Sequence, residues 1–134
     1  MKFSEYTIIR INGTQYSKSE LLKINKFDLK SEEATSVLLF LKTWFDSSSE
    51  IKVQTSGSTG TPKTINIPKQ SFIESAINTC NYLNINNKIN SLLCIPVKYI
   101  GGKMMIIRAL VSGYNLIISE PCKNPLLNQK NEIN

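Results

Sequence analysis

The segment TSGSTGTPK, which runs from Thr55 to Lys63, constrains this 134-residue chain more than any other part of its sequence. Glycines let the backbone of a loop turn its N–H groups toward one point, and Ser and Thr hydroxyls add further hydrogen-bond donors. Phosphate oxygens need many such donors, and Lys63 adds a positive charge beside them. The segment therefore predicts a loop that binds a polyphosphate, and it indicates nucleotide chemistry.

The segment differs from the Walker P-loop, GxxxxGK followed by Ser or Thr, because Pro62 stands where that motif has a glycine. Proline lacks the N–H donor and fixes φ near −65°. Residues 64–67 then alternate polar and apolar side chains as a strand does, whereas a Walker loop opens a helix. We therefore expect the loop to join two strands, 51–54 and 64–67, as a hairpin. A Ser/Thr/Gly-rich surface hairpin without a ligand is the alternative interpretation.

The full segment resembles the phosphate-binding loop of the adenylate-forming superfamily, which includes acyl-CoA synthetases, luciferases and the adenylation domains of peptide synthetases. The pattern of that loop reads Thr/Ser-Ser-Gly-Ser/Thr-Thr-Gly-x-Pro-Lys. The matching residues are Thr55, Ser56, Gly57, Ser58, Thr59, Gly60, Pro62 and Lys63. The resemblance implies that all of these except Pro62 bind the phosphates of ATP, and that Thr59 is a ligand of Mg²⁺.

A second segment, PVKYIGGKMMIIRALVSG at 96–113, resembles the part of the same superfamily where a wall of the acyl-substrate site leads into a helix. It is most similar to the o-succinylbenzoate–CoA ligases of menaquinone biosynthesis. The residues that carry this likeness are Pro96, Tyr99, Gly101, Gly102, Arg108, Ala109 and Leu110. The likeness implies that Tyr99, Gly101, Gly102 and Lys103 bind the substrate. Many members of the superfamily have histidine at the position of Tyr99, but this chain contains none, so no role that needs an imidazole carries over.

Simple packing is the alternative interpretation of the second segment. Met104, Met105, Ile107, Leu110 and Val111 recur at helical spacing, and such a stripe is typical of a core-facing helix. Lys103 would stand in the first turn of that helix, where a positive charge opposes the helix dipole, so an anionic ligand such as a succinyl carboxylate is one explanation for it. We expect Arg108 to be a solvated or salt-bridged surface residue.

The function that the resemblance implies is that of an ATP-dependent acid–CoA ligase. A carboxylate, here o-succinylbenzoate, attacks the α-phosphate of ATP and forms an acyl-adenylate, and the thiol of coenzyme A then displaces AMP. No residue of this chain is assigned a catalytic role, and the cofactors are ATP, Mg²⁺ and coenzyme A. Complete enzymes of the superfamily are several times longer, so we expect an N-terminal fragment that lacks the C-terminal catalytic domain and is inactive alone. A standalone nucleotide-binding or regulatory module is the alternative.

Charge and cysteine content exclude several other classes. The chain has a net charge of +6, but its lysines are scattered, whereas nucleic-acid-binding modules cluster their basic residues. Cys80, Cys94 and Cys122 show no CxxC spacing, which argues against a zinc site and favours reduced thiols, with Cys94 as a core residue in a strand. No stretch is long and apolar enough to span a bilayer, and the N-terminus lacks a signal sequence. We predict a soluble cytoplasmic protein that binds neither nucleic acid nor membrane.

The order of the predicted elements indicates the α/β class, with a mixed sheet and flanking helices that form part of the N-terminal region of an adenylate-forming enzyme. We predict three regions: an N-terminal strand and helices over 1–50, the phosphate-loop hairpin and a strand–helix–strand unit over 51–119, and a loose tail over 120–134. The two strands of that unit should be parallel.

Local patterns place the individual elements. Strands are expected at 6–11, 51–54, 64–67, 91–95 and 115–119, with an Asn12-Gly13 turn after the first. Ser17 with Glu20, and Ser71 with Glu74, have the spacing of capping boxes that begin helices. Two further helices are expected, one after Ser31 and one after Gly101. The apolar face of the helix after Ser31 is predicted to be Ala34, Val37, Leu38, Leu41, Trp44 and Phe45, with Trp44 as a packing anchor.

Overall fold

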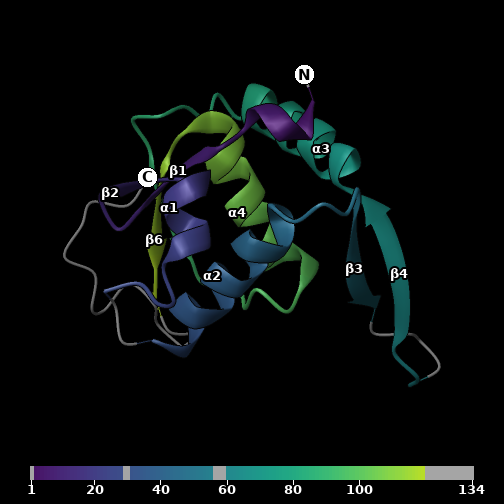
Figure 1. The fold of residues 1–134 in the computed structure, drawn as a ribbon. Coiled ribbons are helices and arrows are strands. Elements are labelled where there is room, and N and C mark those ends of the chain that lie inside the picture. Colours follow the sequence, from purple (N-terminus) through teal and green to yellow (C-terminus); the bar gives the residue numbers. More distant parts are fainter. Residues whose placement is uncertain (1, 29–30, 56–59, 120–134) are drawn as a thin grey trace.

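A four-stranded mixed sheet and the helices packed with it form the body of the protein, and a two-stranded hairpin extends away from this body (Figure 1). The structure is a computed structural model that describes residues 2–28, 31–55 and 60–119. The sheet contains β1 (Ile8–Ile11), β2 (Thr14–Ser17), β5 (Asn90–Leu93) and β6 (Asn115–Ile118), and the hairpin contains β3 (Glu50–Thr55) and β4 (Lys63–Pro68). The helices are η1 (Phe3–Glu5, a 3₁₀ turn), α1 (Lys18–Lys23), α2 (Glu32–Trp44), α3 (Lys69–Tyr82) and α4 (Ile100–Ser112).

The strand order in the sheet is β2-β1-β6-β5. β1 is antiparallel to β2 and parallel to β6, and β5 is also parallel to β6. The predicted parallel strand–helix–strand unit is therefore confirmed as β5–α4–β6, and α4 packs against β1 and β6. Pairing of Ile11 with Leu116 brings the start of the chain into the same sheet as this unit. The α/β class with a mixed sheet is confirmed.

The turn between β1 and β2 forms at Asn12 and Gly13, as predicted. Both residues have positive φ, 47° and 84°, which is the combination that a two-residue hairpin turn of type I′ needs and that Gly and Asn tolerate. The Gly13 N–H donates to Oδ1 of Asn115 at 2.8 Å, and the Ile118 N–H donates to Oδ1 of Asn12 at 2.9 Å. The turn is thus tied to β6 by side chains as well as by the sheet.

Two of the predicted helix starts are confirmed and one is wrong. Ser17 and Glu20 form a complete capping box at α1, and the Ser31 hydroxyl accepts a hydrogen bond from Ala34 N–H at 3.1 Å at the start of α2. α3, however, begins at Lys69 directly after the extended Pro68, so the predicted capping residues Ser71 and Glu74 lie inside the helix. Lys69 is completely buried, and its N–H donates to the Ser49 carbonyl at 2.9 Å.

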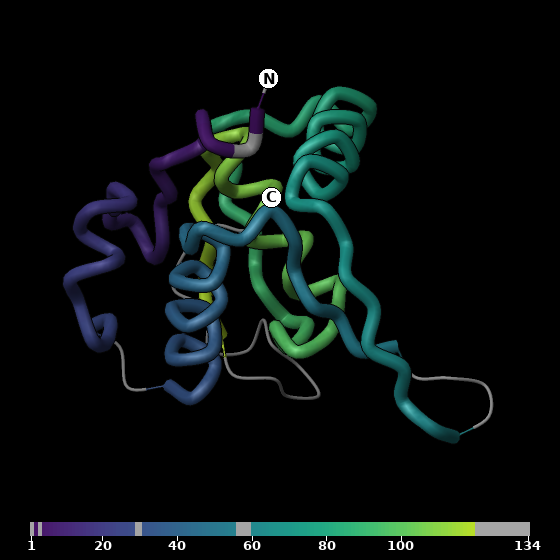
Figure 2. The backbone as a smooth tube through the Cα atoms, turned by 45° about the vertical axis from the view of Figure 1, so that its right-hand side comes forward, coloured from purple at the N-terminus to yellow at the C-terminus, as the bar shows by residue number. Residues whose placement is uncertain are grey.

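The core joins α2, α3 and α4 with the sheet and with the base of the hairpin (Figure 2). Trp44 is buried at its centre, as predicted, and its ring meets the Phe72 ring edge to face at a centroid distance of 6.1 Å. Ile51 and Val53 of β3 are also buried, so one face of the hairpin strand belongs to the core. The base of the hairpin is therefore fixed to the body.

The predicted core position of Cys94 is wrong. β5 ends at Leu93, and the Cys94 side chain is exposed in the segment that follows. Cys122 and the predicted tail 120–134 lie outside the described residues. Within residues 2–28, 31–55 and 60–119, no helix has the length and apolar character needed to cross a membrane.

Candidate functional site

The predicted hairpin around the phosphate-loop motif is confirmed. β3 and β4 pair antiparallel from Glu50 opposite Pro68 to Thr55 opposite Lys63, so the last pair of the ladder consists of the first and last residues of the motif. The Thr55 hydroxyl also donates to the Lys63 carbonyl at 3.2 Å. Ser56, Gly57, Ser58 and Thr59, the centre of the predicted site, lie outside the described residues.

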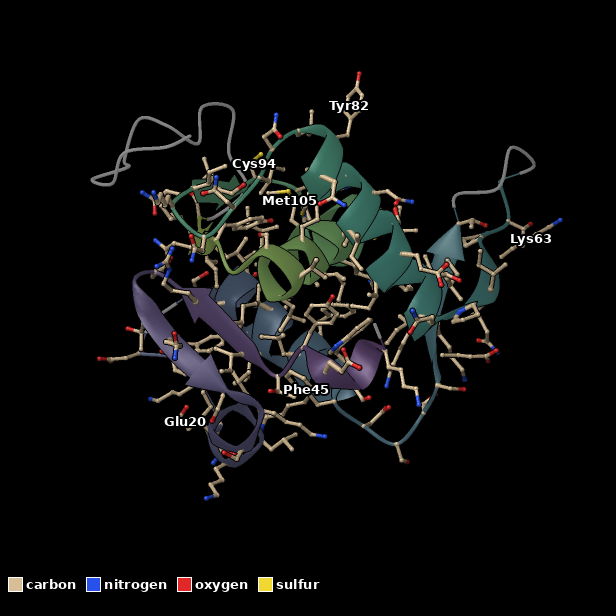
Figure 3. All side chains as sticks on the ribbon, turned by 90° about the horizontal axis from the view of Figure 1, so that it is seen from above. Glu20, Phe45, Lys63, Tyr82, Cys94 and Met105 are labelled. Carbon is tan, nitrogen blue, oxygen red and sulfur yellow. The ribbon has the colours of Figure 1, made fainter. Side chains whose placement is uncertain are left out.

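The described end of the loop is open to solvent. Gly60, Thr61, Pro62 and Lys63 are all exposed. Gly60 has φ +78°, in the left-handed region that glycine adopts without strain. The Lys63 side chain projects away from the body at the far end of the hairpin (Figure 3). The Lys63 side chain is thus accessible from solvent.

The second predicted segment, 96–113, forms the turn before α4, the whole of that helix and its C-cap residue Gly113. Tyr99 is the N-cap residue of α4, and its N–H donates to the Pro96 carbonyl at 3.0 Å. The Tyr99 side chain is 54% exposed, and the Lys98 ammonium lies 5.0 Å from the centre of its ring. An exposed ring of this kind is able to stack against a flat ligand.

Gly101 and Gly102 have different surroundings. A Cβ atom at Gly102 would lie 2.4 Å from the Pro96 carbonyl oxygen, so this glycine lets α4 approach the turn closely. Gly101 instead lines a cavity of about 280 Å³ between α3 and α4, together with Ile67, Met104 and Arg108. Of the two glycines, Gly101 is the one that borders an open space.

Lys103 points to a different cleft. This cleft of about 580 Å³ lies among α2, β3 and the turn before α4, and Phe40 and Lys52 are among its other lining residues. The Lys103 ammonium donates to the carbonyls of Val97 and Lys98, at 2.6 and 3.2 Å. Burial lowers the pKa of Lys103. Its charge in the first helical turn thus has partners within the protein.

Arg108 is half-buried and borders the Gly101 cavity, so its expected position as a solvated or salt-bridged surface residue is wrong. One of its guanidinium nitrogens lies 4.0 Å from the Met105 sulfur. Its Nε atom is buried and finds no hydrogen-bond partner in the part of the chain that the structure describes. Helical spacing alone places Arg108 on a side of α4 but does not show what covers that side.

Three charged residues near the site have no signal in the sequence. The carboxylate of Glu33, in α2, accepts a hydrogen bond from the Val97 N–H at 2.7 Å. The Lys69 ammonium lies 2.8 Å from Oδ1 of Asp46 at the base of the hairpin. No group of three or more Asp, Glu or Cys side chains among the described residues could hold a metal ion, and the predicted Mg²⁺ ligand Thr59 lies outside them.

The fold of this chain is similar to part of several solved protein structures. An acyl-CoA synthetase (AMP-forming)/AMP-acid ligase II-like protein from Dyadobacter fermentans superposes with a TM-score of 0.71 and 28% sequence identity, over 86% of this chain and 32% of that one. The fold is that of the N-terminal region of adenylate-forming enzymes. The chain spans about a third of the length of the D. fermentans protein.

A second solved structure shares the fold over a smaller part of the chain. The o-succinylbenzoate coenzyme A synthetase from Bacillus subtilis, in complex with ATP and a magnesium ion, matches with a TM-score of 0.50 and 22% identity, over 54% of this chain and 15% of that one. At this identity the likeness concerns the fold alone. No protein-family profile and no curated protein sequence matches the chain.

Proposed function

We propose that the chain is part of an ATP-dependent acid–CoA ligase and that the Thr55–Lys63 loop binds the phosphates of ATP. The observation that carries this proposal is the position of the motif: it spans the end of a hairpin whose last ladder pair is Thr55 and Lys63, with the lysine side chain exposed. The 28% identity to an AMP-forming synthetase over most of the chain supports it.

The phosphate site consists of donors from the backbone and side chains of one loop. Its residues are Thr55, Ser56, Gly57, Ser58, Thr59, Gly60 and Lys63. Such a loop acts by holding the polyphosphate in place and by offsetting the charge that develops when pyrophosphate leaves. Mg²⁺, held in part by Thr59, would share that charge.

The carboxylate substrate would lie near the start of α4. Tyr99 offers an exposed ring, and Gly101 borders the cavity that Arg108 also lines. An apolar cavity with a guanidinium group suits an aromatic acid. We propose o-succinylbenzoate, with coenzyme A as the acceptor in the second half-reaction and menaquinone biosynthesis as its context. Gly102 and Lys103 belong to the same segment as Tyr99 and Gly101, at the start of α4.

Binding of Mg-ATP tests the phosphate site. Chemical-shift changes of the ¹⁵N-labelled 134-residue chain should localise to the hairpin with Mg-ATP and be much weaker with AMP, which lacks the β- and γ-phosphates. Lys63→Ala should weaken the affinity for Mg-ATP by about 10-fold or more, the equivalent of one charge-assisted contact. Lys52→Ala is the matched control, because Lys52 is an exposed lysine of the same hairpin outside the loop.

Activity separates a ligase from a nucleotide-binding module. A ligase of this class exchanges pyrophosphate into ATP only in the presence of its carboxylate, so exchange that depends on o-succinylbenzoate would identify the reaction and the substrate. Binding of Mg-ATP without exchange, for any carboxylate and in a longer protein that contains this chain, would instead indicate a regulatory module. Equal binding by the Lys63→Ala and Lys52→Ala variants would contradict the phosphate site itself.

A further inference from the structure

Val97 lies between two oppositely charged side chains that hold both of its backbone polar groups. Its N–H donates to Oε1 of Glu33 at 2.7 Å, and its carbonyl accepts from the Lys103 ammonium at 2.6 Å. Glu33 comes from the first turn of α2, and Lys103 comes from the first turn of α4. One residue of the turn is thus attached to two helices.

The Glu33 carboxylate is withdrawn from water, and Lys103 is partly buried. Glu33 is 8% exposed and Val97 is buried, while the Lys103 ammonium lies 5.8 Å from the centre of the Phe40 ring. Hydrogen bonds to charged groups are about twice as strong as those between neutral groups, and more so where water is excluded. Among the described residues no strand pairs with Val97, so the two charged side chains supply the hydrogen bonds that its buried peptide groups need.

This attachment fixes the segment that carries Tyr99. Besides Val97, the Lys103 ammonium holds the carbonyl of Lys98, and the Lys103 N–H donates to the Tyr99 carbonyl at 3.2 Å. Gly102 lies against the carbonyls of Ile95 and Pro96. Two of the three N–H donors of the Lys103 ammonium are therefore used within the turn.

We propose that Glu33 and Lys103 are positioning residues that clamp Val97 and thereby hold Tyr99 in place for the carboxylate substrate. The part that concerns the substrate rests on the function proposed above. Lys103 then acts through the turn and not by contact with a substrate carboxylate. Glu33 distinguishes the clamp from direct contact of Lys103 with the substrate. The clamp needs the Glu33 carboxylate, whereas direct contact does not, because a negatively charged residue behind the turn has no favourable interaction with a carboxylate.

Amide hydrogen exchange of the full 134-residue chain tests the clamp directly. Lys103→Met and Glu33→Met keep the side-chain length and remove one partner each, so each should speed exchange at Val97 by about 10-fold or more. Lys103→Arg and Glu33→Gln keep a donor or an acceptor and should stay within about 3-fold of the unmodified chain. Lys98→Met is the matched control, because it removes the charge of a neighbouring exposed lysine.

Ligand binding tests the consequence. If the clamp is correct, Lys103→Met and Glu33→Met both weaken the affinity for o-succinylbenzoate by about 5-fold or more. The affinity for Mg-ATP stays within about 2-fold in both variants. In Lys103→Arg and Glu33→Gln the affinity for o-succinylbenzoate remains that of the unmodified chain. The fluorescence of Trp44, the single tryptophan, monitors the fold of each variant.

Two results would overturn the clamp. The first is unchanged Val97 exchange in both methionine variants. The second is loss of o-succinylbenzoate binding in Lys103→Met but not in Glu33→Met, which would show that the ammonium contacts the substrate itself. If the unmodified chain binds neither ligand, the proposed function fails, and the clamp is judged from Val97 exchange.

Discussion

The Lys69 ammonium lies 2.8 Å from Oδ1 of Asp46, although the Lys69 side chain is completely buried and the Asp46 side chain is 46% exposed. The same ammonium donates to the Asp46 carbonyl at 3.3 Å, and the Lys69 N–H donates to the Ser49 carbonyl at 2.9 Å. Asp46 and Ser49 precede β3, and Lys69 follows β4. These contacts join the two ends of the phosphate-loop hairpin at its base, so they set how the loop is held against the body.

Removing the two partners should have unequal effects on stability. Asp46→Ala leaves a buried ammonium without its carboxylate and should lower the free energy of unfolding by about 1–3 kcal/mol, a range that allows for water reaching the half-exposed site. Lys69→Met removes the buried charge and fills its space, so we expect a loss within about 1 kcal/mol, or a gain. Urea unfolding of the variants measures both values. A larger loss for Lys69→Met than for Asp46→Ala would contradict this prediction and would show that the Lys69 side chain stabilises the fold through contacts other than the Asp46 carboxylate.

The same pair gives the fold a dependence on acidic pH. The hydrogen bond from Lys69 is the main reason that the pKa of Asp46 lies below its ordinary value of 3.8. A carboxyl group with a lowered pKa in the folded state stabilises the fold above the unfolded-state pKa and loses this contribution as pH falls through the folded-state pKa. The stability difference between the unmodified chain and Asp46→Ala should therefore be constant near neutral pH and shrink below about pH 4.

Urea midpoints measured at a series of pH values check this dependence. The comparison with Asp46→Ala matters because Glu20 also has a lowered pKa, caused mainly by its hydrogen bonds with Ser17. That contribution is common to both proteins and cancels in the difference. A difference that stays the same down to the most acidic pH would mean that the Asp46 carboxylate does not stabilise the fold through its charge.

The parts of the fold that could be predicted from the sequence depend on neighbours in the chain. The Asn12-Gly13 turn, the Ser17 and Glu20 capping box and the apolar face of α2 all follow from spacings of a few residues. The hairpin around the phosphate-loop motif was predictable for the same reason, since alternating residues flank a loop of turn-forming residues.

Several features that the sequence does not reveal depend on contacts between distant residues. In the sequence Lys69 is one of many scattered lysines, but its partner Asp46 lies 23 residues earlier in the chain, and α3 begins at Lys69, ahead of Ser71. Glu33 reaches Val97 across 64 residues of chain. Arg108 lines a cavity that residues of α3 also line, and no local pattern specifies the packing of α3 against α4.

The two described cysteines should differ in reactivity. Cys94 is exposed, whereas Cys80 is buried and its pKa is raised by that burial, which leaves less of the reactive thiolate at a given pH. At pH 8, iodoacetamide should therefore alkylate Cys94 at least about 10 times faster than Cys80. Peptide mass spectrometry of a time course measures the two rates. Comparable rates would mean that α3 opens readily from α4.

The two adjacent glycines of α4 should respond oppositely to alanine. In Gly102→Ala the new Cβ would lie 2.4 Å from the Pro96 carbonyl oxygen and 2.7 Å from that of Ile95, and both atoms belong to the backbone of the turn before α4. Such overpacking should lower the free energy of unfolding by about 1–3 kcal/mol. In Gly101→Ala the nearest atom is Cδ1 of the Ile95 side chain at 3.4 Å, which is able to move. Because alanine favours a helix over glycine by about 1 kcal/mol, this variant should be as stable as the unmodified chain or more stable.

Urea unfolding of the two variants measures this contrast at neighbouring positions of one helix. The prediction extends to ligands, because Gly101 borders the cavity of about 280 Å³ and Gly102 does not. Under the proposed function, Gly101→Ala should reduce the affinity for o-succinylbenzoate without loss of stability, since its methyl group is added beside that cavity. If Gly102→Ala were as stable as Gly101→Ala, the turn before α4 would be able to move away from the helix. The close approach of the Ile95 and Pro96 carbonyls would then not explain the glycine at position 102.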